Sequence, residues 1–76
     1  MEFDFKIQFI RDGEKEEIRI GMMSQSYWHA LHDVQRTMFE KGHPWKAGDS
    51  AAIFLVTPVL NKEDLILGYR HKIGES

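Results

Sequence analysis

Hydrophobic and polar residues alternate along the first ten positions of the chain. The odd positions carry Phe3, Phe5, Ile7 and Phe9, and charged or amide residues stand between them. A period of two is typical of a strand that buries one face and exposes the other. The pattern therefore predicts a strand over Glu2–Ile10.

The dipeptide Asp12-Gly13 follows this strand and predicts a tight hairpin. Both residues tolerate the positive φ angles that a two-residue type I′ turn requires. If Arg11 pairs with Glu14, the next segment places mostly apolar residues opposite the first, in the pairs Phe9–Glu16, Ile7–Ile18, Phe5–Ile20 and Phe3–Met22. A slip of one residue would turn charged side chains into the core, so the pattern specifies this register.

Residues Ser24–Gly42 have a helical rather than an alternating period. The stripe Tyr27, Leu31, Val34 and Met38 follows the spacing of a core-facing helix, with Ala30 beside it. We expect Ser24 or Ser26 to cap the first turn. We also expect Gly42 to take the left-handed conformation after the last turn, with Pro44 preventing any continuation.

The remaining segments predict two more strands. Ala51–Leu60 is apolar on both faces, which is typical of a central or doubly covered strand. Pro58 gives the opposite indication, because a residue without an amide donor belongs at a strand end or an edge. After a polar turn at Asn61–Asp64, Leu65–Ile73 is predicted to form the last strand, with Leu65, Leu67 and Tyr69 on one face. Residues 74–76 are predicted to fray.

These elements predict one α+β domain over residues 1–76, in the order β-β-α-β-β. One helix should pack on one face of a four-stranded, mostly antiparallel sheet. Two arrangements fit the pattern. In a grasp-like fold the first and last strands would be parallel neighbours, and in the other arrangement every pair would be antiparallel.

Composition narrows the classes of function. The chain has 76 residues, no cysteine and a formal net charge of −2. These features exclude disulfides and thiolate chemistry and argue against a general nucleic-acid binder. No apolar run could span a bilayer, and we expect a cytoplasmic protein.

Candidate chemistry is sparse. Ser24, Ser26, His29, His32 and Asp33 have the residue types of a metal site or a catalytic triad. Neither a metal-binding motif such as HExxH nor a nucleophile motif such as GxSxG accompanies them. We therefore expect no enzymatic activity, no metal and no cofactor.

Large apolar side chains outside the predicted core stripe point instead to a protein partner. On the helix these are Trp28 and Phe39, with His32 beside them, and Trp45 lies in the following loop. They could bind a partner, or Trp28 and Phe39 could cover the sheet edge while Trp45 plugs the end of the helix. Because one helix covers only one face, Phe54 and Val56 of the apolar strand should belong to an exposed patch on the other.

A nucleic-acid-binding sheet face is the alternative hypothesis. Its basic residues would be Lys6, Arg19, Arg70 and Lys72. In the predicted register Lys6 faces Arg19, a like-charge pair that costs stability unless an anion bridges it. Phe54 and Tyr69 could stack on bases.

The sequence therefore favours a small non-enzymatic protein-binding module, an inhibitor or regulator that occupies a surface of a larger protein, or one that forms homodimers. In size and general organisation it resembles the small, cysteine-free, single-domain proteins that bacteriophages use to inhibit host machinery, anti-CRISPR proteins among them. This resemblance assigns no role to any particular residue.

Overall fold

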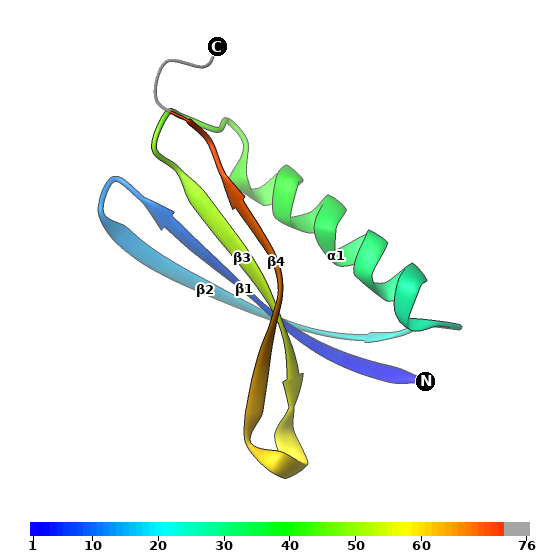
Figure 1. The fold of residues 1–76 in the computed structure, drawn as a ribbon. Helices are drawn as coiled ribbons and strands as arrows, with labels where there is room; N and C mark the ends of the chain where they lie inside the picture. The colour runs from blue at the N-terminus through cyan, green and yellow to red at the C-terminus, as the bar shows by residue number, and fades with distance from the viewer. Residues whose placement is uncertain (73–76) are drawn as a thin grey trace.

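The protein consists of one β-sheet with a single α-helix lying across it (Figure 1). The computed structural model describes residues 1–72. The elements are β1 (Glu2–Arg11), β2 (Glu14–Met23), α1 (Tyr27–Gly42), β3 (Ser50–Thr57), the short 3₁₀ helix η1 (Pro58–Leu60) and β4 (Lys62–Arg70). The predicted order β-β-α-β-β and the α+β class are confirmed. No helix in the described part of the chain is both long and apolar enough to cross a membrane.

The four strands form one sheet in the order β2-β1-β3-β4, and every neighbouring pair is antiparallel. The grasp-like arrangement is therefore not the one adopted, because β1 lies between β2 and β3 rather than beside β4. The two conflicting indications in the third strand are both satisfied. β3 is central, as its apolar faces predict, and it ends at Thr57, so Pro58 lies just outside the ladder.

The first hairpin has the predicted register. Arg11 pairs with Glu14, and the apolar pairs from Ile7–Ile18 to Phe3–Met22 follow in sequence. Asp12 and Gly13 have φ angles of 52° and 77°, as a type I′ turn requires. Alternation and turn chemistry specify the same pairing, and the structure adopts it.

The helix begins where the second of the two serines caps it. The Ser26 hydroxyl accepts a hydrogen bond from the His29 amide at 3.3 Å. The prediction for Gly42 was wrong, because Gly42 is the last helical residue and the extended His43 is the C-cap. Glycine is needed for another reason: a Cβ at position 42 would come within 2.6 Å of Cε2 and Cη2 of the Trp45 ring.

The last strand differs from its prediction in extent and register. It runs from Lys62 to Arg70 rather than from Leu65 to Ile73, and Ile73 lies outside the described residues. A register shift between Ile53 and Phe54 places Leu67 opposite Ile53 but Leu65 opposite Phe54. Leu65 and Leu67 therefore lie on opposite faces, contrary to the simple alternation, because a bulge inserts an extra residue between them.

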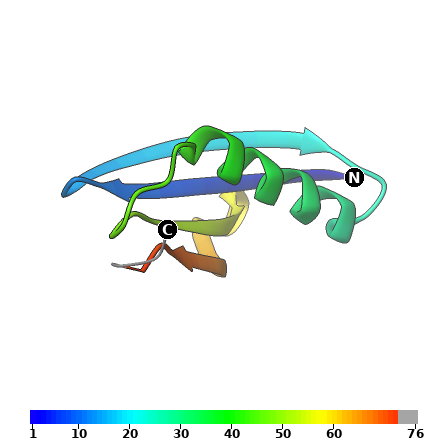
Figure 2. The same ribbon diagram turned by 90° about the horizontal axis from the view of Figure 1, so that it is seen from above.

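The core lies between α1 and one face of the sheet. From the helix, Ala30, Val34 and Met38 are fully buried, while Tyr27 and Leu31 are half-buried at its margin. The sheet contributes Phe5, Ile7, Phe9, Ala51 and Ile53. Figure 2, seen from above the helix, shows α1 lying across the strands. The opposite face of the sheet has no such covering element among residues 1–72.

Candidate functional site

The two ends of the helix present their aromatic residues differently. Trp28, in the first turn, is 74% exposed and has one aromatic neighbour, Tyr27, at a centroid distance of 5.4 Å. His32 is exposed one turn further on, and Phe39 is 41% exposed near the end of the helix. Trp28, His32 and Phe39 lie along one side of α1; within residues 1–72 Phe39 packs against Trp45 and Tyr69, whereas Trp28 stays largely exposed.

Trp45 packs over the C-terminal end of the helix. Its ring lies 6.0 Å from Phe9, 5.9 Å from Phe39 and 4.7 Å from Tyr69, measured between centroids. Its Nε1 donates a hydrogen bond to the carbonyl oxygen of Phe39 at 3.3 Å. This is the plug that the sequence offered as one of two roles for Trp45, and the cluster also draws Phe39 toward the body of the protein.

Two methionines beside the connection from β2 to α1 are also exposed; Met23 pairs with Glu2, so its side chain belongs to the face of the sheet opposite α1. Met1 and Met23 are 72% and 76% exposed. The Ser24 amide donates to the Met1 carbonyl oxygen at 2.9 Å, which holds the N-terminus beside the connection from β2 to α1. Figure 1 shows these segments gathered at one end of the molecule. We call the exposed side chains of Trp28 and His32 on α1 the Trp28 surface.

Side-chain periodicity gives no signal for the exposure of these methionines, because each stands at the boundary of an element. There a period of two or 3.6 no longer predicts which way a side chain points. The available signal was the apolar pair Met22-Met23 directly before a predicted cap, where only one of the two can face the core.

The open face of the sheet is less apolar than its sequence suggests. Strand pairing aligns its side chains in rows, of which two matter here: Arg19–Lys6–Phe54–Leu65 and Gly21–Asp4–Val56–Glu63. Phe54 and Val56 are half-buried, and the Lys6 ammonium lies 4.6 Å from the centroid of the Phe54 ring. The expected continuous patch is thus interrupted by a cation.

The anion that bridges the facing pair Lys6 and Arg19 comes from the chain itself. Lys6 Nζ donates to Glu63 Oε1 at 2.8 Å, and Arg19 approaches the other oxygen of Glu63 at 3.6 Å. Glu17 adds a weaker contact to Lys6 at 3.9 Å. The hydrogen bond from Lys6, helped by the charges of Lys6 and Arg19, lowers the pKa of the Glu63 carboxyl group.

The other two predicted basic residues lie elsewhere. Arg70 pairs with Ser50 at the opposite end of β3, and Lys72 follows the end of β4. The structure therefore does not bring the four cations together, and two of them already share Glu63. Nucleic-acid binding by the open face stays a prediction, and the separation of these cations and their pairing with Glu63 argue against it.

Among the candidate catalytic and metal-binding residues, Ser26, His29 and Asp33 make local contacts at the helix, whereas His32 is exposed. Ser26 Oγ lies 2.8 Å from His29 Nδ1 while it also caps the helix. Asp33 pairs with Arg36 at 3.4 Å. Within residues 1–72, no three histidine or acidic side chains are grouped so that they could hold a metal ion.

Comparisons with known proteins identify no relative. No family model matches the chain, and neither a curated protein nor a solved structure is similar to it. Function must therefore be inferred from surface geometry and chemistry alone.

Proposed function

We propose that this chain is a small protein-binding module that inhibits or regulates a larger protein by occupying part of its surface. The proposed contact is the Trp28 surface. The observation that carries this proposal is the 74% exposure of Trp28 on a well-capped helix.

The fold does not need Trp28. The helix buries Ala30, Val34 and Met38 against the sheet, and Trp28 lies outside that stripe. A large apolar side chain held in water is unfavourable unless a partner covers it. Tryptophan is enriched at protein interfaces, and it dominates binding energy where it fills a pocket. These properties support a role for Trp28 in association.

The helix also presents Trp28 in a rigid setting. Its backbone is ordered by the Ser26 cap and by packing of the following turns. Binding through a preformed helix costs less ordering entropy than binding through a flexible loop. The same surface could pair with a second copy of the chain, and the mass in solution distinguishes a homodimer from a module that binds another protein.

The test compares capture of a binding partner by three forms of the protein. Wild type, Trp28→Ala and the matched helix control Glu40→Ala are immobilised and exposed to lysate of the source cells. We expect a partner that wild type and Glu40→Ala retain, and that Trp28→Ala binds at least roughly 30-fold more weakly, the loss typical of an interface hot spot.

A different result would locate the contact elsewhere or remove it. If Phe54→Glu abolishes capture and Trp28→Ala does not, the open sheet face is the binding surface instead. If wild type captures no protein above the level of Trp28→Ala, and sedimentation shows a monomer, the proposal fails.

A further inference from the structure

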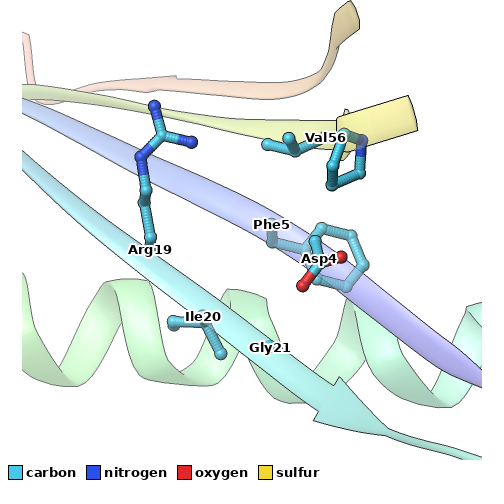
Figure 3. Close-up of a pocket in the computed structure, with 7 residues that line it drawn as sticks. Asp4, Phe5, Arg19, Ile20, Gly21 and Val56 are labelled. Carbon is cyan, nitrogen blue, oxygen red and sulfur yellow. The ribbon is translucent and has the colours of Figure 1, made fainter. Parts of the chain in front are cut away.

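A pocket of about 210 Å³ opens on the uncovered face of the sheet (Figure 3). It arises in the row Gly21–Asp4–Val56, where Gly21 supplies no side chain beside Asp4. Figure 3 shows Asp4 between β2 and the end of β3, with Val56 above it. Pro58, at the start of η1, completes the apolar side of the pocket.

The polar groups of this pocket are not equally available. Arg19 reaches across β1 toward β3, where its guanidinium approaches Glu63 at 3.6 Å. Asp4 is half-buried, and within residues 1–72 its carboxylate forms no ion pair. The pocket therefore combines an apolar wall with one carboxylate that the described part of the chain leaves uncompensated.

We propose that this pocket receives a lysine side chain of a protein partner. The ammonium group would donate to the Asp4 carboxylate, and the four methylenes would lie along Val56 and Pro58. Lysine buries its stem while its charged head finds a polar partner, which matches this distribution of apolar and anionic groups.

The inference rests on the proposed function only in assuming that the partner is a protein. The pocket lies on the face of the sheet opposite α1, so it is a second contact rather than part of the Trp28 surface. Its test needs no partner and can fail independently of the capture experiment.

The experiment is an NMR titration of the isolated chain with N-acetyl-lysine methylamide. We expect shifts centred on the amides of Asp4, Gly21 and Val56 that weaken as salt is added, because an ion pair at a partly open site is screened. The uncharged analogue N-acetyl-norleucine methylamide has a stem of similar length without the ammonium group. It should bind on the order of tenfold more weakly, since hydrogen bonds to charged groups contribute most of the difference.

Three variants separate the pocket from the rest of the sheet. Asp4→Asn keeps the shape and removes the charge, and it should lower the affinity for the lysine probe about tenfold. Gly21→Ala places a Cβ 3.2 Å from Asp4 Oδ1, and it should also weaken binding by filling the gap. Glu17→Gln removes a carboxylate of the same face outside the pocket and should leave probe binding unchanged. Unaltered spectra away from the pocket establish that each variant is folded.

Several results would overturn the inference. Equal shifts with the norleucine and lysine probes would make the pocket merely apolar. Unchanged affinity in Asp4→Asn would remove the carboxylate from the site. Much tighter binding of putrescine than of the lysine probe would point to a free diamine rather than a protein side chain. Trp28→Ala should bind the lysine probe like wild type, whatever its effect on partner capture.

Discussion

The two tryptophans of this protein lie at opposite ends of one helix and have opposite surroundings. At the C-terminal end, Trp45 folds back over Gly42 and meets Phe9, Phe39 and Tyr69. At the N-terminal end, Trp28 touches Tyr27 and is otherwise largely in water. One end of the helix is closed by the protein itself, and the other is open.

The difference between the two ends depends on what the neighbouring elements offer. Near Trp45, a glycine leaves room for the ring, and β4 brings Tyr69 within reach. Near Trp28, the far part of the β3–β4 hairpin turns away from the helix, as Figure 1 shows. The same residue type therefore completes the fold at one end and remains exposed for association at the other.

The largest expected effect separates the two tryptophans by their contribution to stability. Trp45→Ala removes a half-buried ring from a cluster and should cost about 3 kcal/mol of unfolding free energy, the lower part of the range for buried aromatics. Trp28→Ala should change stability by less than about 0.5 kcal/mol, as is usual for an exposed side chain. Urea unfolding of both variants measures this difference. Equal losses would mean that the N-terminal end is also closed in solution.

A smaller effect is expected at Gly42, which lies beneath the Trp45 ring. Whether substitution raises or lowers the stability of the protein is informative there. Alanine within a helix is normally about 1 kcal/mol more favourable than glycine. Here Gly42→Ala should instead destabilise by about 1–2 kcal/mol, because the new Cβ overlaps the Trp45 ring and displaces it. Thermal unfolding gives the sign. Gly68→Ala is the control, since a Cβ at Gly68 meets nothing within 4 Å; stabilisation by Gly42→Ala would show that the ring is not seated there.

The smallest expected effect tests whether the open face also contributes to stability. The folded protein lowers the pKa of Glu63 below its ordinary value of 4.5. A lowered pKa means that the ionised form is favoured by folding, so this contribution is complete above the ordinary value and is lost as the pH falls through the lowered one. Glu63→Gln should flatten this part of the acid dependence. Because Glu63 is exposed, the change should be slight.

Local patterns predicted the first half of the chain well, because the turn and the helix cap that specify its structure join residues only a few positions apart. The Asp12-Gly13 turn and the alternation around it specify the hairpin register, and Ser26 caps the helix three residues before the amide it accepts from. The second half was predicted less well. The bulge that separates Leu65 from Leu67 could not be predicted from the alternation of side chains in β4. It depends on the register in which β4 pairs with β3.

The candidate site divides in the same way. The sequence singled out Trp28, His32 and Phe39 from helical spacing alone, and they do lie along one side of α1. It could not foresee that Phe39 would be drawn into the Trp45 cluster, or that Met1 would be tied to Ser24. It recognised that the Lys6–Arg19 pair needed an anion, but the identity of Glu63 required the pairing of β3 with β4.

By itself the sequence determined the elements, their order, the hairpin register and the buried stripe of the helix, because turn chemistry and side-chain periodicity act over a few residues. Only the tertiary structure decided the strand order, the role of Gly42, the bridging of two cations by Glu63 and the exposure of Trp28. These features depend on which surfaces meet across the fold. Contacts between residues distant in the chain are chosen by packing and twist, which local periodicity does not encode.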